Sequence, residues 1–127
     1  MNPLVPDVLN ELAGLMLRSA APDRPDAERA SDLGLSAQLL SVAAEIWDRQ
    51  AHILVEENRA IRALLGESGL DDDLHLSALK AANDGLRVRL IEAQIAAETA
   101  GDLGRQAAIW AELAVSTERR RLSTAPV

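Results

Sequence analysis

Apolar residues recur at helical spacing along most of the chain and divide it into four segments. The first segment follows two prolines, and its apolar residues lie three or four positions apart, so it predicts a helix over residues 5–20. These residues are Val5, Val8, Leu9, Leu12, Leu15 and Met16. Pro22 and Pro25 then interrupt the pattern, which predicts a linker over residues 21–30.

The second segment is the longest and predicts a helix over residues 31–66. Its apolar residues follow a seven-residue repeat, which is typical of a helix that packs along one seam. The seam consists of Leu40, Ala43, Trp47, Leu54, Ile61 and Leu64, flanked by Leu39, Ile46 and Ile53. Ser31 or Ser36 is suited to cap the start of this helix, and Gly66 and Gly69 are suited to end it.

Two further segments predict helices over residues 72–100 and 102–122. Their apolar faces consist of Leu79, Leu86, Leu90, Ala93 and Ala97 in the third segment, and of Leu103, Ala107, Trp110, Leu113 and Ala114 in the fourth. Gly101 and Gly104 are each unfavourable by about 1 kcal/mol inside a helix relative to alanine, and Asp102 is suited to begin a new helix. We therefore predict a break here. The alternative is one continuous helix, because small residues continue at helical spacing across the junction.

The composition indicates the fold class. Strong helix formers dominate the sequence, and residues that favour strands are scarce, with no Phe and no Tyr at all. A chain of 127 residues can bury one hydrophobic core. The expected fold is therefore all-α, a single domain over residues 1–127 that forms an antiparallel four-helix bundle with a short first helix and a long second one.

The net charge of −7 argues against nucleic acid as a partner, because binding to phosphates requires a basic face. We expect no membrane partner, because no apolar run approaches the roughly 20 residues that cross a bilayer. The chain also begins without the features of a signal peptide and contains no cysteine, so a cytoplasmic location is expected. Two charged runs are interpreted as stabilising helix ends: the arginines at 119–121 and the aspartates at 71–73.

One frame of polar and apolar residues occurs twice. It reads Asn-x-x-(Ile/Leu)-Arg-x-x-Leu, at Asn58, Ile61, Arg62 and Leu65, and again at Asn83, Leu86, Arg87 and Leu90. On a helical wheel each asparagine lies at the edge of the apolar stripe, and each arginine flanks it. Because Asn58 and Asn83 lie equally far from the middle of a short loop, the two amides are predicted to meet in one layer of an antiparallel hairpin. Such a pair fixes the register of two helices.

Further polar residues point into the same stripe and define a candidate ligand site. Gln50 and Glu57 lie on the apolar face of the second helix, where an unpartnered carboxylate is costly to bury. Glu57 therefore requires a cation or a proton, and Arg87 or Arg62 is the expected partner. The candidate ligand-binding residues are Gln50, Glu57, Asn58, Asn83 and Arg87. A purely structural role, in which these groups specify helix pairing, is the interpretation that we favour.

The sequence predicts no catalytic residues, no metal site and no cofactor. Its only histidines are His52, opposite the apolar stripe, and His75, near the start of the third helix, and no Glu-x-x-His motif of the di-iron bundles occurs. No cysteine is present, no pattern couples a serine to a base, and no glycine-rich loop follows a strand. A non-enzymatic protein is therefore expected.

A second apolar ridge is predicted as an interface. Val88, Ile91 and Ile95 lie roughly opposite the Leu86 face of the third helix, so one hairpin cannot bury both faces. The fourth helix could cover this ridge in part. We favour a second copy of the chain and predict a homodimer, because two-fold dimers are the commonest oligomers. The two tryptophans, by contrast, are predicted as core anchors.

The repeated frame is followed by two further patterns, Leu-Ile-x-x-Gln-x-x-x-Glu over residues 90–98 and Ile-Trp-x-x-Leu with Glu-Arg-Arg over residues 109–120. Together they resemble a family of small uncharacterised bacterial proteins that form helical bundles, and the resemblance covers about residues 36 to 122. It implies the fold and supplies no activity. A histidine often stands in that family where this chain has Gln94, which puts any metal role of the relatives in doubt here.

These features together predict a non-enzymatic interaction or assembly protein that forms a homodimer or binds another protein. The alternative is a small-ligand-binding or enzyme-accessory protein that uses the polar cluster between the second and third helices.

Overall fold

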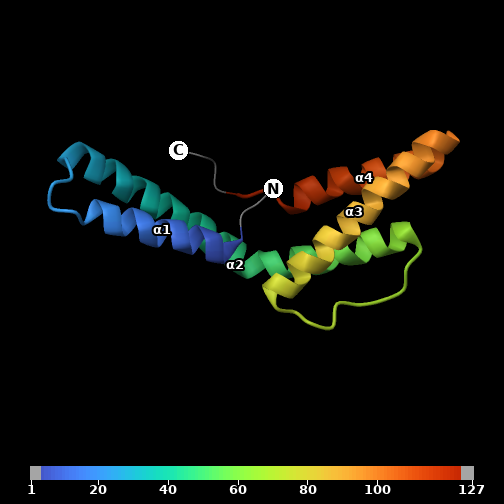
Figure 1. Ribbon diagram of the computed structural model, residues 1–127, viewed down its shortest axis with the longest axis horizontal. Helices are drawn as coiled ribbons and strands as arrows, with labels where there is room; N and C mark the ends of the chain where they lie inside the picture. Colours follow the sequence, from blue (N-terminus) through green and yellow to red (C-terminus); the bar gives the residue numbers. More distant parts are fainter. Residues whose placement is uncertain (1–3, 124–127) are drawn as a thin grey trace. The chain divides into compact units, whose positions relative to one another are not determined.

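The computed structural model describes residues 4–123, which form four α-helices and no strand (Figure 1). The helices are α1 (Val5–Ser19), α2 (Asp26–Leu65), α3 (Leu76–Ala100) and α4 (Leu103–Arg119). The predicted all-α fold, with four helices of which the first is short and the second long, is confirmed. Two compact units divide the chain within α2. One holds α1, α2 up to Arg49, and residues 122–123, and the other holds residues 50–121. The single domain over residues 1–127 stays a prediction.

The first unit is a helical hairpin. Its buried apolar residues are Val5, Val8, Leu12 and Leu15 on α1, with Ala43 and Ile46 on α2. The helix α2 begins at Asp26, five residues earlier than predicted, so the linker is shorter than residues 21–30. Pro25 accepts the first helical hydrogen bond, from the backbone N–H of Arg29 at 2.9 Å. The acidic residues Asp26 and Glu28 lie in the first turn, where they favour helix initiation.

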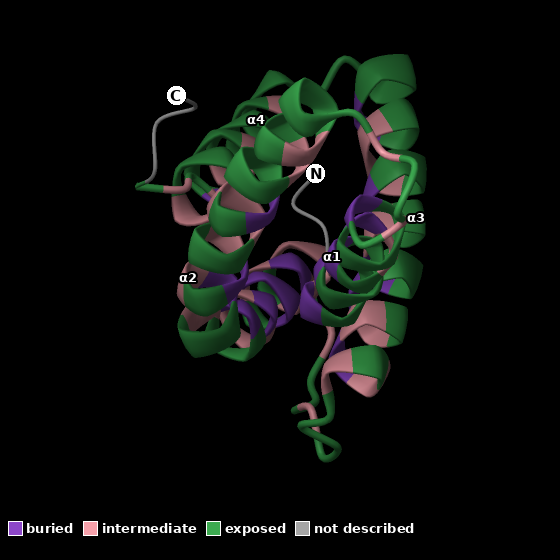
Figure 2. Cartoon of the chain, turned by 90° about the vertical axis from the view of Figure 1, so that its left-hand side faces the viewer, coloured by how far each residue is buried: buried purple, intermediate pink, exposed green. Residues whose placement is uncertain are grey.

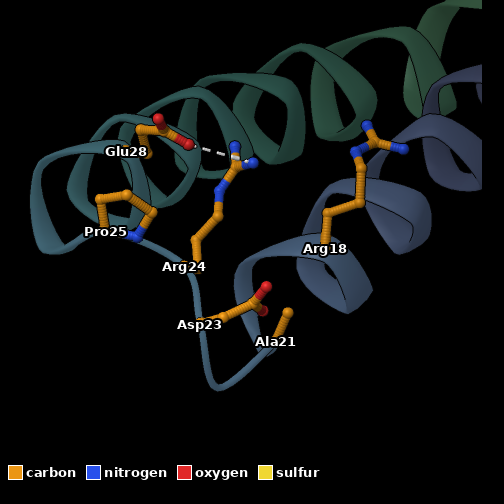
Figure 3. Close-up of a pocket in the computed structure, with 6 residues that line it drawn as sticks. All are labelled: Arg18, Ala21, Asp23, Arg24, Pro25 and Glu28. Atoms are coloured by element: carbon orange, nitrogen blue, oxygen red, sulfur yellow. Dashed lines mark ion pairs between the residues drawn. The ribbon is translucent and has the colours of Figure 1, made fainter.

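Arginine side chains hold the turn between α1 and α2 together, and Figure 3 shows one of them, Arg24, paired with Glu28. The Nη2 of Arg29 donates to the carbonyl oxygens of Ala21 and Arg24, at 3.4 and 3.3 Å. The guanidinium group of Arg24 in turn forms ion pairs with Glu28 at 3.2 Å and with Asp32 at 2.9 Å. The predicted linker over residues 21–30 is therefore a short hydrogen-bonded turn followed, from Asp26 on, by the first residues of α2.

The buried face of α2 differs from the predicted seam. In the first unit the buried α2 residues are Ser36, Ala43 and Ile46, whereas Leu40 and Trp47 are exposed. Trp47 is 72% exposed, so its prediction as a core anchor is wrong. Among the described residues of this unit α1 is the only helix beside α2, and the side chain of Trp47 is turned by about 100° from that of Ile46.

The second unit packs the C-terminal part of α2 with α3 and α4. Its core consists of Ile61, Leu86, Leu90 and Ile109, with Leu64, Leu65, Ala93 and Leu113 against it. Figure 2 shows buried positions on the helices next to broad exposed surfaces. Trp110 follows the buried Ile109 directly and is 61% exposed, so its prediction as a core anchor is also wrong. The buried residues of α4 are Ile109 and Ser116. Of the five residues predicted for its apolar face, Leu113 packs against the core, whereas Leu103, Ala107, Trp110 and Ala114 are exposed, so the predicted face of this helix is wrong.

The predicted break between the third and fourth helices is confirmed. Gly101 has a φ of 68°, and its backbone N–H donates to Glu98 while that of Asp102 donates to Ala97. These two bonds form a Schellman motif, which requires the left-handed conformation that glycine adopts readily. The side chain of Asp102 then caps α4 by accepting from the N–H of Arg105 at 3.0 Å. Gly66 ends α2 in the same way, with a φ of 70°.

Two predicted helix limits are too generous, and in both cases the polar cluster explains the difference. The third helix begins at Leu76 rather than at residue 72, because Asp71 is held by side chains of α2 instead of capping α3. The fourth helix ends at Arg119 rather than at residue 122. Arg120 follows it and directs its guanidinium group to Glu57. Arg120 therefore has a specific partner, in addition to the predicted interaction of the arginines at 119–121 with the negative end of the helix dipole.

Candidate functional site

A buried carboxylate lies at the centre of the second unit. Glu57 is on α2, one turn before the core residue Ile61, and it is 0% exposed. Its Oε1 accepts hydrogen bonds from the Oγ of Ser116 at 2.6 Å and from the Nε of Arg120 at 2.6 Å. Both donors come from the last part of α4 and the residue that follows it. One oxygen of Glu57 thus connects α2 to α4.

The other oxygen of Glu57 connects α2 to α3. Its Oε2 accepts from the Nδ2 of Asn83 at 3.2 Å and from the Nη2 of Arg87 at 3.2 Å. The Nη2 of Arg120 also donates to it. A carboxylate that accepts from two guanidinium groups, an amide and a hydroxyl has replaced the water that it loses on burial.

These donors decide the protonation state of Glu57. Burial by itself raises the pKa of this carboxyl group, but the hydrogen bonds from Arg120, Ser116 and Arg87 and the charge of Arg120 outweigh it. The pKa of Glu57 is lowered from 4.5 to about 2. Glu57 is therefore ionised at neutral pH, which makes it a poor general acid.

A second carboxylate is held in a similar way next to the first. Asp71, in the loop before α3, accepts from the Nη2 of Arg62 at 2.7 Å. Both of its oxygens also accept from the Nδ2 of Asn58, each at 3.2 Å. The hydrogen bond from Arg62 lowers the pKa of Asp71, against a smaller rise from burial, and Asn58 lowers it further. Asp71 is therefore also held in its charged form.

The two asparagines join the carboxylate sites. The Nδ2 of Asn83 donates to the Oδ1 of Asn58 at 3.0 Å, so the predicted amide pair across the hairpin is confirmed. The Oδ1 of Asn83 accepts from Arg87 at 3.0 Å and from Arg120 at 3.3 Å. The Nδ2 of Asn58 also reaches the carbonyl oxygen of Leu79 at 3.4 Å. The amides therefore lie within one continuous network.

The network explains why the frame occurs twice. In each copy an asparagine and the arginine four residues later lie on one side of a helix and clamp one carboxylate. Asn58 and Arg62 clamp Asp71, while Asn83 and Arg87 clamp Glu57. Arg120 supplies a further cation to Glu57, so three guanidinium groups face two carboxylates.

Of the five residues predicted to bind a ligand, four meet in this network: Glu57, Asn58, Asn83 and Arg87. Gln50 is buried on the same helix, but it lies two turns before Glu57, which is about 10 Å along the axis. Sequence reasoning missed Asp71, Ser116 and Arg120 as members of the cluster. Ser116 and Arg120 could have been found, because they continue the helical face of Ile109 and Leu113 with polar side chains.

The network fits a role in helix pairing better than a role in catalysis or ligand binding. The network's donors and acceptors are engaged with one another, and none of its atoms is among the described buried polar atoms that lack a partner. Two hollows in the described part of the chain have no network residue in their lining. One is lined by Asp72, Asp73, Leu74 and His75. The other is at the α1–α2 turn and is lined by Arg18, Ala21, Asp23, Arg24, Pro25 and Glu28 (Figure 3).

The hollow at the α1–α2 turn brings charges of both signs together. Arg24 pairs with Glu28 at 3.2 Å, and Arg18 pairs with Glu11 at 3.2 Å. The basic groups of this hollow are thus paired with acidic neighbours, and its lining contains no serine, threonine, cysteine, lysine or histidine. We see no catalytic arrangement in it.

Within residues 4–123, no three metal-binding side chains come together to hold an ion. None of the helices described is both long and apolar enough to cross a membrane. Comparison with known proteins finds no match to this chain among protein-family models, curated proteins or solved structures.

Proposed function

We propose that this chain is a non-enzymatic interaction protein that associates through exposed apolar side chains of α3 and α4, first of all with a second copy of itself. The observation that carries the proposal is the ridge on α3 formed by Val88, Ile91 and Ile95, all of which are exposed. The sequence left open whether the fourth helix covers this ridge. It does not, since each of the three side chains is more than half exposed.

A second set of exposed apolar side chains lies next to this ridge. On α4 the exposed residues Leu103, Ala107, Trp110 and Ala114 follow one another at intervals of three and four. Hydrogen bonds from Arg87 to Ser116 and from Gln106 to the carbonyl of Ala97 fix the register of α3 and α4. In this register Ile91 lies level with residues 110–114, and helical geometry turns both sets to the side of the hairpin away from α2.

The polar network supports this role because it makes the hairpin a fixed platform. Glu57 and its partners set the height of α3 and α4 relative to α2, and buried polar groups of this kind specify register. Exposed apolar side chains gathered on one face of a monomer promote its association with other molecules, either through one defined surface or without one. A fixed register of α3 and α4 favours association through one defined surface.

Sedimentation velocity over a range of protein concentrations tests the proposal. The wild-type chain is expected to sediment as a species larger than the monomer, and the Ile91→Glu/Ile95→Glu variant is expected to sediment as a smaller species than the wild type at the same concentration. A matched control replaces exposed leucines of the loop before α3, Leu70→Glu/Leu74→Glu, and should sediment like the wild type. Equal sedimentation of the ridge variant and the wild type would refute the role of the ridge.

A further inference from the structure

Another apolar surface lies on α2, within the first unit and away from its buried residues. We call it the α2 seam, and it consists of Ala27, Ala30, Leu33, Gly34, Ala37, Leu40, Ser41, Ala44 and Trp47. Every one of these residues is exposed, and none carries a charge. The buried residues Ser36, Ala43 and Ile46 lie on the neighbouring side of the helix, about 120° from the middle of the seam, and Trp47 lies at the boundary between the two. The seam is thus a separate face that α1 leaves uncovered.

The α2 seam has the sequence pattern of a coiled coil. Alanine recurs every seven residues at positions 30, 37 and 44, and a large residue recurs every seven residues as Leu33, Leu40 and Trp47. Such a repeat keeps one line of side chains facing a partner helix along its whole length. From Ala27 to Trp47 the seam is about 30 Å long. A surface helix that faced only water would need no such repeat.

Gly34 supplies an independent observation. It lies inside α2, where glycine is unfavourable relative to alanine. Yet a Cβ atom added at Gly34 would meet nothing within 4 Å, so no packing within this chain requires a glycine here. Small residues on a helix face permit the close approach of another backbone, and Gly34 shares its face with Ala37, Ser41 and Ala44. Gly34 is therefore compatible with the close approach of another helix to this face.

From these observations we infer that the α2 seam pairs with the α2 seam of a second copy in antiparallel orientation. In one antiparallel register each layer joins a large residue to an alanine of the other copy. Leu33 faces Ala44, Leu40 faces Ala37, and Trp47 faces Ala30. In a parallel pair the alanines would face alanines and the tryptophans would face each other. Only the antiparallel pair therefore fills every layer evenly.

The area available matches what a stable dimer needs. Trp47, Leu33 and Leu40 are each more than half exposed, and with the small residues between them the seam offers on the order of 600 Å² per chain. Two copies would bury about 1,200 Å², which is the lower limit for specific interfaces. The seam carries no charge, so bringing two seams together adds no local repulsion between chains that each have a net charge of −7.

This inference does not depend on the proposed role of the ridge on α3. A chain with two self-pairing surfaces can join two neighbours and form assemblies larger than a dimer. Comparing four proteins therefore separates the two ideas: the wild type, a seam variant (Leu33→Glu/Leu40→Glu), the ridge variant (Ile91→Glu/Ile95→Glu) and the combination of both. If both surfaces act, the wild type exceeds a dimer, each variant stops at a dimer, and the combination is a monomer.

In sedimentation equilibrium the seam variant is expected to weaken one association step at least tenfold, because unpaired carboxylates would enter an apolar layer. The matched control is Leu35→Glu, which changes an exposed leucine of the same helix outside the seam and should leave that step unchanged. If only the ridge acts, the seam variant keeps the wild-type mass distribution, and the inference is overturned. An equal loss of association in Leu35→Glu would overturn it too.

The orientation can be tested by crosslinking, since the chain has no cysteine of its own. Two single-cysteine variants, Leu33→Cys and Ala44→Cys, are mixed and oxidised under mild conditions. The antiparallel register brings these positions within disulfide reach, so the mixture should yield the mixed disulfide. Disulfides between identical positions only would indicate a parallel pair and refute the register. If no crosslink forms and Trp47 in the seam is protected from iodide quenching in a monomeric chain, then the chain covers its own seam and the pairing is refuted.

Discussion

The Nδ2 of Asn83 donates to the Oδ1 of Asn58 at 3.0 Å, and this bond links the two copies of a repeated sequence frame across the α2–α3 hairpin. Each amide is also tied to a carboxylate, Asn58 to Asp71 and Asn83 to Glu57. The pair therefore has a second effect beyond setting register, because it holds two charged sites at a fixed separation. Mutations at the pair and at the charged sites should report on this coupling.

Alanine substitution at Asn58 or Asn83 should each lower the free energy of unfolding by about 1–3 kcal/mol, because buried partners are left without hydrogen bonds. The double variant should lose about 1 kcal/mol less than the sum of the single losses, since the residues share a bond. Urea denaturation of all three proteins measures this coupling. Asn10→Ala, at an exposed position of α1, is the control and should change little. Strictly additive losses would contradict a shared network.

Removing one cation from Glu57 should be more costly. Arg120→Met leaves the buried carboxylate with only Arg87 as a charged partner and is expected to destabilise the chain by about 3 kcal/mol. Arg121→Met changes the neighbouring exposed arginine and should cost less than about 0.5 kcal/mol. Chemical denaturation of the two variants compares them directly. Similar losses in both would mean that the charge of Glu57 is not balanced through Arg120.

Acid should destabilise the chain through the same carboxylate. The pKa of Glu57 is about 2 in the folded chain and 4.5 as its ordinary value, so its contribution is complete above about pH 5 and is lost as the pH falls towards 2. The loss is on the order of 3 kcal/mol, and the lowered pKa of Asp71 acts in the same direction. Denaturation at pH 7 and pH 3 should show a smaller drop in stability for Glu57→Gln than for the wild type. An equal drop would assign the acid sensitivity to other groups.

The glycines at the end of α3 and within it should respond in opposite directions. Gly101→Ala forces alanine into a φ of 68° and should destabilise by about 1 kcal/mol. Gly85→Ala, inside α3 with open space around its position, should stabilise by about 0.5–1 kcal/mol. Thermal unfolding of both variants gives the two signs. A stabilising Gly101→Ala would mean that the turn between α3 and α4 does not require the left-handed conformation.

Iodide quenching of the two tryptophans should depend on protein concentration. With Trp110→Phe the remaining Trp47 is expected to be quenched freely in dilute solution, because it is 72% exposed, and protected once copies associate. With Trp47→Phe the same measurement follows Trp110 beside the ridge. Protection of Trp47 at every dilution would show that its surface is covered within one chain.

Helical periodicity was sufficient to predict the number of helices, the break at Gly101 and the meeting of Asn58 with Asn83, because each rests on residues close in sequence or symmetric about one loop. It could not identify which face of α2 is buried. That face is decided by α1, which covers only one side, and Trp47 therefore lies outside the core although it continues an apolar repeat. Arg120 was missed for another reason: it continues the helical face of Ile109, but the arginines at 119–121 were interpreted only through the helix dipole.

The contact between Glu57 and Arg120 spans 63 positions of the chain, which is long for a helical protein. A hairpin of α2 and α3 alone would offer Glu57 the guanidinium group of Arg87 but not the donors of Arg120 and Ser116. Burial of the carboxylate is therefore favourable only when the third helix of the unit arrives. The consequence is kinetic: the hairpin should be a short-lived species, and docking of α4 should coincide with the folding barrier of this unit.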